Sequence, residues 1–121
     1  MSSTSFGKAY QGTCLCKSIK VLLDGPPVKT LLCHCLDCQK SAGAPYQSCA
    51  IYPTSRVQVI DPDQSLKYYI TPKEKVSSGS EKYIFFCGVC GTPLFNRPMS
   101  HEGEKTVIKT GFLDRIDKEP G

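Results

Sequence analysis

Cysteine is the residue type in this chain whose spacing could do chemistry. Eight cysteines occur in 121 residues, and seven of them fall into three clusters. The central cluster is Cys33-His34-Cys35-Leu36-Asp37-Cys38, with Cys14-Leu15-Cys16 upstream and Cys87-Gly88-Val89-Cys90 downstream. The two pairs together could supply the four thiolates of a closed, structural zinc site, whereas three thiolates leave one zinc position open for chemistry. The clusters therefore predict two zinc ions, one structural and one catalytic.

A disulfide framework is the main alternative use of eight cysteines, and the sequence argues against it. The N-terminal residues Met1 to Ser5 are polar and contain no apolar segment of the kind found in secretory signals. No apolar stretch approaches the ~20 residues of a membrane span. In a cytoplasmic chain the spacings Cys-x-Cys and Cys-x-x-Cys favour metal or redox chemistry. We therefore expect a cytoplasmic protein that does not associate with a membrane.

The two flanking pairs carry signals of different strength. Cys87-Gly88-Val89-Cys90-Gly91 has the composition of a zinc knuckle, in which a tight turn brings two sulfurs to one ion and backbone N–H groups point at the thiolates. We expect Gly88 and Gly91 to supply the positive φ angles of that turn. Cys14 and Cys16 would share one face of a strand, so both could reach one ion, and the alternative is a pair of buried structural thiols.

The central cluster leaves its fourth ligand open. We expect Cys33 and Cys35 on one strand face and Cys38 in the turn that follows. Cys49 lies in an apolar stretch further on, where it either closes the site as a fourth ligand or packs as a small hydrophobic side chain. His34 alternates away from Cys33 and Cys35, which leaves it a hydrogen-bond donor to the ligands, a base or a packed imidazole. A second histidine, His101, reads as a surface residue.

Short β-prone stretches between Gly- and Pro-containing turns predict a mostly β fold with little helix. The predicted strands lie at residues 19–23, 28–32, 46–52, 56–60, 66–70, 82–86 and 105–110, and one helical turn lies at 36–41. We expect a single domain over residues 10–115, a flexible N-terminus over 1–9 and an exposed loop over 71–80. A zinc ion shared by the two flanking Cys pairs would clasp the ends of the sheet together.

The net charge of the chain and its distribution restrict the classes of molecule that it is expected to bind. Lys and Arg outnumber Asp and Glu by 15 to 11, a formal net charge of +4, without a basic stripe or an arginine-rich segment. Nucleic-acid binding is therefore not expected, although a modest positive potential would attract a small anionic molecule. No phosphate-binding glycine loop and no spacing typical of a serine–histidine–aspartate triad occurs.

Four segments in order resemble one known family, the glutathione-dependent formaldehyde-activating enzymes, which also includes centromere protein V-like proteins. They are Gly12-Thr13-Cys14-Leu15-Cys16, the central cluster with Ser41-Ala42-Gly43, Phe86 to Phe95, and Thr110-Gly111-Phe112-Leu113-Asp114. The resemblance extends from about residue 10 to 115. The chain departs from the family pattern at Lys17, where a glycine is usual, and at Gln39-Lys40, where a basic pair is frequent.

The resemblance implies an Mss4-like fold of antiparallel sheets with two zinc ions. It assigns the structural zinc to Cys14, Cys16, Cys87 and Cys90, and the catalytic zinc to Cys33, Cys35 and Cys38. It also implies a carbon–sulfur lyase or synthase that acts on glutathione adducts such as S-(hydroxymethyl)glutathione. In that reaction His34 would shuttle a proton and Lys40 would attract a glutathione carboxylate. If Cys49 closes the second site, the alternative is a non-catalytic, zinc-stabilised protein-binding module.

Overall fold

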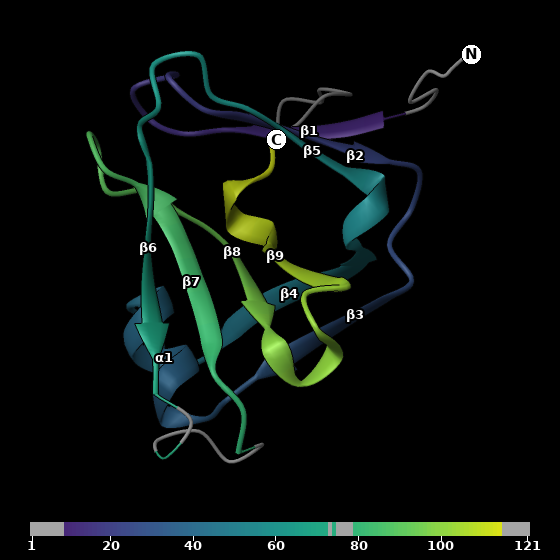
Figure 1. The fold of residues 1–121 in the computed structure, drawn as a ribbon, viewed down its shortest axis with the longest axis vertical. Coiled ribbons are helices and arrows are strands. Elements are labelled where there is room, and N and C mark those ends of the chain that lie inside the picture. Colours follow the sequence, from purple (N-terminus) through teal and green to yellow (C-terminus); the bar gives the residue numbers. More distant parts are fainter. Residues whose placement is uncertain (1–8, 73, 75–78, 115–121) are drawn as a thin grey trace.

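The structure is a computed structural model that describes residues 9–72, 74 and 79–114. Antiparallel strands dominate it, and one α-helix, α1, is present in the described part of the chain (Figure 1). The mostly β fold with little helix is therefore confirmed. The strands are β1 (Ala9–Thr13), β2 (Lys20–Asp24), β3 (Lys29–Cys33), β4 (Gln47–Pro53), β5 (Val57–Ile60), β6 (Leu66–Thr71), β7 (Lys82–Cys87), β8 (Pro93–Pro98) and β9 (Lys105–Lys109), and the helices are α1 (Leu36–Ala42) and the 3-10 turns η1 (Thr54–Arg56), η3 (Met99–His101) and η4 (Thr110–Phe112).

The strands form two sheets. A three-stranded sheet has the order β1-β2-β5, and a six-stranded sheet has the order β3-β4-β9-β8-β7-β6. Figure 1 shows the small sheet running across one end of the large one, with α1 at the opposite end beside β6 and β7. The connections β2–β3, β4–β5 and β5–β6 cross between the sheets, so the fold depends on contacts distant in sequence.

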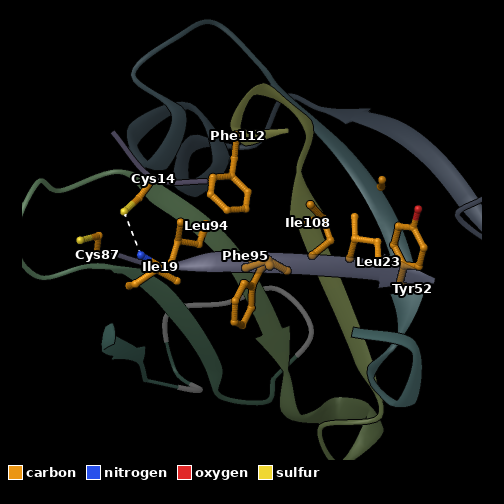
Figure 2. Packing of buried hydrophobic residues seen from close by; sticks show 11 residues of the cluster. Cys14, Ile19, Leu23, Tyr52, Cys87, Leu94, Phe95, Ile108 and Phe112 are labelled. Atoms are coloured by element: carbon orange, nitrogen blue, oxygen red, sulfur yellow. Dashed lines mark hydrogen bonds between the residues drawn. The ribbon is translucent and has the colours of Figure 1, made fainter. Parts of the chain in front are cut away.

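The hydrophobic core lies between the two sheets. On β4, Ala50 and Tyr52 point toward the core, and on β9 so does Ile108, which pairs with Ala50. Val21 and Leu23 of β2 meet them from the small sheet. Figure 2 shows these side chains in one continuous cluster that ends beside the sulfurs of Cys14 and Cys87.

The other face of the six-stranded sheet carries a different set of side chains. Because successive residues of a strand point to opposite faces, Cys49 and Ile51 of β4 point away from the core. Their cross-strand partners, Lys109 and Val107, lie on the same face. Helix α1 and the three-cysteine cluster lie against this second face, so the sheet separates the core from the candidate site.

Strand β1 and η4 were not predicted from the sequence, and they bind each other. The Asp114 N–H donates to the Gln11 carbonyl at 2.8 Å, and the Thr13 hydroxyl donates to Asp114 Oδ2 at 2.7 Å. A Cβ atom at Gly12 would overlap the Phe112 ring. Glycine is therefore required at position 12 for η4 to seal the core, which explains why Gly12 and the Thr110–Asp114 segment occur together.

Most other sequence expectations hold, with shifts of one or two residues at strand ends. Strand β8 is a further element that the sequence did not predict, and both of its prolines, Pro93 and Pro98, lie at its ends, where a missing N–H costs least. Thr71, assigned to a loop, instead ends β6 and is buried. The rest of that predicted loop lies partly outside the described residues, as does the predicted flexible N-terminus except for Ala9. None of the described helices is long and apolar enough to cross a membrane.

The turn that carries Cys14 and Cys16 holds Lys17 in a backbone conformation whose cost a substitution can measure. Its φ angle is 68°, in the left-handed region, and its N–H donates to the Cys14 carbonyl at 2.9 Å. A side chain in this conformation costs about 1–2 kcal/mol. We expect Lys17→Gly to raise the free energy of unfolding by roughly 0.5–1 kcal/mol after the entropy cost of glycine is subtracted. Thermal unfolding of the zinc-loaded proteins measures this, and Gly91→Ala, at φ 78°, should shift Tm the opposite way. A lower Tm for Lys17→Gly would contradict the assignment.

Candidate metal centres and the adjoining cavity

The four flanking cysteines converge on one point, although the pairs lie far apart in the chain. Cys14 directly follows β1 and Cys16 lies in the turn after it, while Cys87 ends β7 and Cys90 lies in the β7–β8 turn. Their sulfurs all lie within 4.8 Å of one another. The distances are 3.7 Å for Cys14–Cys16 and 3.8 Å for Cys16–Cys87. The pairs come from different sheets, so the cluster joins the small sheet to the large one and does not clasp the ends of a single sheet.

The Cys87–Cys90 turn has the hydrogen bonds expected of a knuckle. The N–H groups of Val89 and Cys90 point at Cys87 Sγ, at 3.4 and 3.5 Å. Gly91 has the expected positive φ, but Gly88 does not, which corrects the prediction for that residue. Gly88 is required for space instead, because a Cβ there would lie 2.5 Å from Lys67 Cγ.

Hydrogen bonds to sulfur favour thiolates at this cluster. Thr92 accepts the Leu15 N–H at 3.0 Å, and its hydroxyl lies 3.1 Å from Cys90 Sγ. The Thr92 hydroxyl, helped by the Cys16 N–H, lowers the pKa of Cys90 to about 5. Burial raises the pKa of Cys87, but N–H donors and the Ser18 hydroxyl outweigh it and leave that pKa below its ordinary value. Two of the four sulfurs are thus prepared as metal ligands.

The three central cysteines form a second cluster at the start of α1. Cys33 is the last residue of β3, Cys35 is the N-cap of α1, and Cys38 lies in its first turn. Cys35 therefore lies on the helix cap and not on the strand as predicted. The Cys38 N–H donates to Cys35 Sγ at 3.4 Å, and the Cys33 and Cys35 sulfurs are 3.6 Å apart. The helix cap gathers the three sulfurs within 4.8 Å of one another.

Both clusters fit a tetrahedral zinc ion. Zn–S bonds of about 2.3 Å place neighbouring sulfurs about 3.8 Å apart, close to the spacings found in each cluster. Burial raises the pKa of Cys38 far above its ordinary value, and the sulfurs of Cys33 and Cys35 raise it further. A divalent cation would offset that mutual repulsion and allow all three thiols to ionise together. The donor chemistry therefore suits zinc at both places.

Cys49 lies close to the central cluster without joining it. It is not among the sulfurs that lie within 4.8 Å of one another. Both Cys49 and Cys38 accept a hydrogen bond from the Gln47 amide, whose Nε2 is 3.5 Å from each sulfur. The Gln47 amide thus bridges Cys38, inside the cluster, and Cys49, outside it.

The buried ammonium group of Lys109 contacts the Gln47 amide at its oxygen, while the amide nitrogen faces the cysteines. Lys109 is 6% exposed, and its Nζ donates to Gln47 Oε1 and to Ser41 Oγ, the latter at 2.9 Å. Burial lowers the pKa of Lys109 to about 8. Among the residues that the structure describes, no carboxylate pairs with Lys109. The thiols of Cys49 and Cys38 are the groups whose negative charge would stabilise its ammonium form, so Lys109 and the thiolates act as mutual counter-charges.

A cavity of about 350 Å³ opens beside the central cluster. The four sulfurs of Cys33, Cys35, Cys38 and Cys49 lie along it, and aliphatic side chains of the sheet form another wall. Lys82, at the start of β7, also lines it, and its positive charge acts to lower the pKa of Cys35. The four-cysteine cluster does not border this cavity, although Cys14 lines a separate one of about 580 Å³ with polar side chains that include Lys20 and Asp114.

The structure places His34 and Lys40 apart from this cavity. The His34 side chain is exposed and packs edge-on against Tyr46, with ring centroids 5.9 Å apart. Lys40 is exposed on the last turn of α1 and lines a separate groove with Asp37, Ser41 and Tyr69. The His101 backbone belongs to η3, and its side chain lies outside what the structure describes.

Four residues beside the central cluster were missed from the sequence, namely Gln47, Lys82, Asn96 and Lys109. Gln47, Lys82 and Lys109 lie in predicted strands, whereas Asn96 lies in β8, which was not predicted. Gln47 and Lys109 come from neighbouring strands that pair only in the folded chain. A polar residue in an otherwise apolar strand was the signal available in the sequence.

Comparisons with known proteins agree with this arrangement. A family model described as "Glutathione-dependent formaldehyde-activating enzyme" matches residues 9–120. A crystal structure of a Rhodobacter sphaeroides protein, a structural genomics target, superposes with a TM-score of 0.64 and 19% identity, over 91% of each chain. At that identity the likeness shows the fold alone. The search of curated proteins finds no match.

Substitution of one cysteine in each cluster should separate the roles of the two clusters. Cys87→Ser removes a sulfur that joins the two sheets, and structural zinc supplies ~10–16 kcal/mol in small domains, so we expect loss of the cooperative unfolding transition. Cys33→Ser should retain that transition and bind one zinc per chain fewer than the natural chain. Circular dichroism with metal analysis measures both, and equal loss of folding in the two variants would contradict the division.

A double-mutant cycle tests the Lys109–Gln47 pair. Gln47→Leu leaves the buried Lys109 ammonium with Ser41 Oγ as its remaining acceptor, so we expect it to lower the free energy of unfolding by about 1–3 kcal/mol. Replacing both, in Gln47→Leu/Lys109→Met, should recover most of that loss because no unpaired polar group remains. Denaturant unfolding of the zinc-loaded proteins measures the cycle. A double variant no more stable than Gln47→Leu would show that the two residues are not coupled.

Proposed function

Because the chain belongs to the family of glutathione-dependent formaldehyde-activating enzymes, we propose that it is a zinc-dependent carbon–sulfur lyase or synthase acting on glutathione adducts. The adducts are of the S-(hydroxymethyl)glutathione type or of a related conjugate. Cys14, Cys16, Cys87 and Cys90 would hold the structural zinc, and Cys33, Cys35 and Cys38 the catalytic zinc. The cytoplasm, with its reduced thiols and glutathione, is the compartment that suits this chemistry.

One observation carries the proposal: the three-cysteine cluster borders a cavity, while the sulfur of Cys49 lies outside the cluster and accepts a hydrogen bond from Gln47. A site built only for stability would be closed by four protein ligands. Three ligands and an adjoining cavity leave room for a substrate sulfur. The same observation weighs against the binding-module alternative, which requires Cys49 as the eighth ligand.

The bound zinc ion would act on the substrate sulfur, and three residues of the chain would support it. Zinc, when bound to Cys33, Cys35 and Cys38, would favour the thiolate form of a substrate sulfur. Gln47 keeps Cys38 in place by its hydrogen bond, and Lys109 balances the negative charge of the ligands from behind. Lys82, at the cavity, would attract an anionic substrate.

In the synthase direction, a carbon–sulfur bond forms between the glutathione sulfur and a carbonyl carbon. The thiol loses its proton, and the carbonyl oxygen, which becomes a hydroxyl, gains one. His34 and Lys40 remain proposed for proton transfer and for binding a glutathione carboxylate. Since both side chains are exposed and lie off the cavity, each role requires the bound glutathione to extend over the surface of α1.

Cobalt substitution tests the open site directly. We expect glutathione to change the visible spectrum of the Co²⁺-substituted protein at one of two metal equivalents, because only the three-cysteine site has a free position. An unchanged spectrum at saturating glutathione would indicate two closed sites and would favour the binding module, with Cys49 as a ligand. Cys49→Ala is the matched control, since it should leave the glutathione response intact if Cys49 is not a ligand.

Cys35→Ser tests the catalytic assignment. Cys35 is exposed at the helix cap, so its loss should leave the fold intact while carbon–sulfur bond formation falls by at least 100-fold. Turnover of glutathione with formaldehyde, or release of aldehyde from the adduct, measures the activity, and the unfolding temperature reports the fold. Unchanged turnover in a folded Cys35→Ser variant would rule out this assignment.

A further inference from the structure

The cavity beside the central cluster has a wall suited to an aliphatic group. Leu31 of β3, Ile51 of β4 and Val107 of β9 project into it from three neighbouring strands, and Pro98 of β8 adds to them. The strand pairing places Val107 opposite Ile51. These side chains lie on the sheet face that points away from the core, so they are not needed to fill it.

The cavity is large for a one-carbon group. Its volume is about 350 Å³, whereas a hydroxymethyl group has two heavy atoms and occupies little more than one water, ~30 Å³ in the liquid. Glutathione itself carries two carboxylates and an ammonium group. Apart from the cysteines, Asp37 and Lys82 are the charged side chains along the cavity among the described residues. An aliphatic wall would desolvate the charged ends of glutathione without compensation, so these ends belong outside and the group attached to sulfur belongs inside.

Asn96 is an independent sign of a ligand. This β8 residue lines the cavity and is 4% exposed, and its Oδ1 atom is buried without a hydrogen-bond partner. Its strand neighbours on either side, Val107 and Ile84, are aliphatic and offer no donor. A buried carbonyl oxygen left unpaired costs about 1–3 kcal/mol, and the cost disappears when a ligand supplies the donor. The missing partner is therefore a hydroxyl or N–H group inside the cavity.

We propose that the cavity binds the S-substituent of a glutathione adduct derived from an aldehyde with an aliphatic chain of several carbons, and that Asn96 accepts a hydrogen bond from a hydroxyl further along that chain than the carbon attached to sulfur. The inference rests on the proposed function and makes it more specific. Leu31, Ile51 and Val107 determine the preference for chain length, and Asn96 determines the preference for a hydroxyl-bearing chain. Formaldehyde would then be a poor partner, because its adduct leaves the aliphatic wall unfilled.

Chain length is tested by binding, without turnover. S-Methyl-, S-propyl- and S-hexylglutathione are titrated into the zinc-loaded protein by calorimetry. Each buried methylene should tighten Kd roughly fourfold, from ~0.8 kcal/mol per methylene, so S-hexyl should bind on the order of 50-fold more tightly than S-methyl if three methylenes are buried. Val107→Phe should remove this gain and leave S-methyl binding unchanged. Leu31→Phe, on an edge strand, serves the same purpose if Val107→Phe does not fold, and Val28→Phe, in an exposed loop, is the matched control.

The hydroxyl preference is tested with Asn96→Leu, which keeps the shape of the side chain and removes its carbonyl. Positional isomers of S-(hydroxyhexyl)glutathione, with the hydroxyl on C2 to C6, are compared with S-hexylglutathione. At least one isomer should bind the natural chain at least tenfold more tightly than S-hexyl. Asn96→Leu should weaken binding of that isomer and strengthen binding of S-hexyl, since it removes the unpaired oxygen. A purely structural Asn96 would shift both ligands in the same direction.

The results separate this inference from the function it rests on. Equal affinity for S-methyl and S-hexyl, or no binding of either, overturns the substrate class. If glutathione alone still changes the cobalt spectrum, the carbon–sulfur function stands with a smaller electrophile. If glutathione leaves the spectrum unchanged as well, both proposals fail. An advantage of the hydroxyl isomers that survives Asn96→Leu overturns the role of Asn96 alone.

Discussion

The structure depends on four sulfurs that reach one point from two different sheets. Cys14 and Cys16 come from the turn after β1, and Cys87 and Cys90 from the end of β7. The two sheets share a modest core, and Cys16 and Cys87, whose sulfurs meet between them, lie 71 residues apart in the chain. A shared metal ion would remove most of the freedom of one sheet relative to the other. The position of β7 then follows, and with it Lys82 at the far end of that strand, beside the central cysteines.

The residues of the six-stranded sheet that fill the core lie on one of its faces, and those that border the candidate site lie on the other. Ala50, Tyr52 and Ile108 fill the core on one face, while Cys49, Ile51 and Val107 border the cavity on the other. This division is a consequence of strand geometry, since adjacent residues cannot share a face. Side chains on the cavity face can therefore differ between relatives without disturbing the core. A family built on this sheet can keep its metal sites and alter the group that it accepts on sulfur.

Buried charge links the sheet to the central cysteines. A lysine is rarely buried without a carboxylate partner, yet among the described residues the Lys109 ammonium donates hydrogen bonds to the neutral side chains of Gln47 and Ser41. Three thiolates and one zinc ion carry a net charge of −1, which a cation behind Gln47 would balance. The arrangement also favours one orientation of the Gln47 amide, with its carbonyl toward Lys109 and its NH₂ group toward Cys38 and Cys49. That orientation keeps Cys49 a neighbour of the cluster.

Cysteine spacing alone determined the division into a group of four and a group of three, because metal geometry restricts which spacings can share an ion. Alternation and turn residues, which act over a few residues, determined most of the strands but not β1 and β8. Tertiary structure decided what depends on distant pairing: that the four-cysteine cluster joins two sheets, that Gly88 is needed for space, that His34 points to solvent and that Gln47, Asn96 and Lys109 surround the cavity. Those residues meet through strand register and sheet order, which arise from contacts across the whole chain that no local pattern encodes.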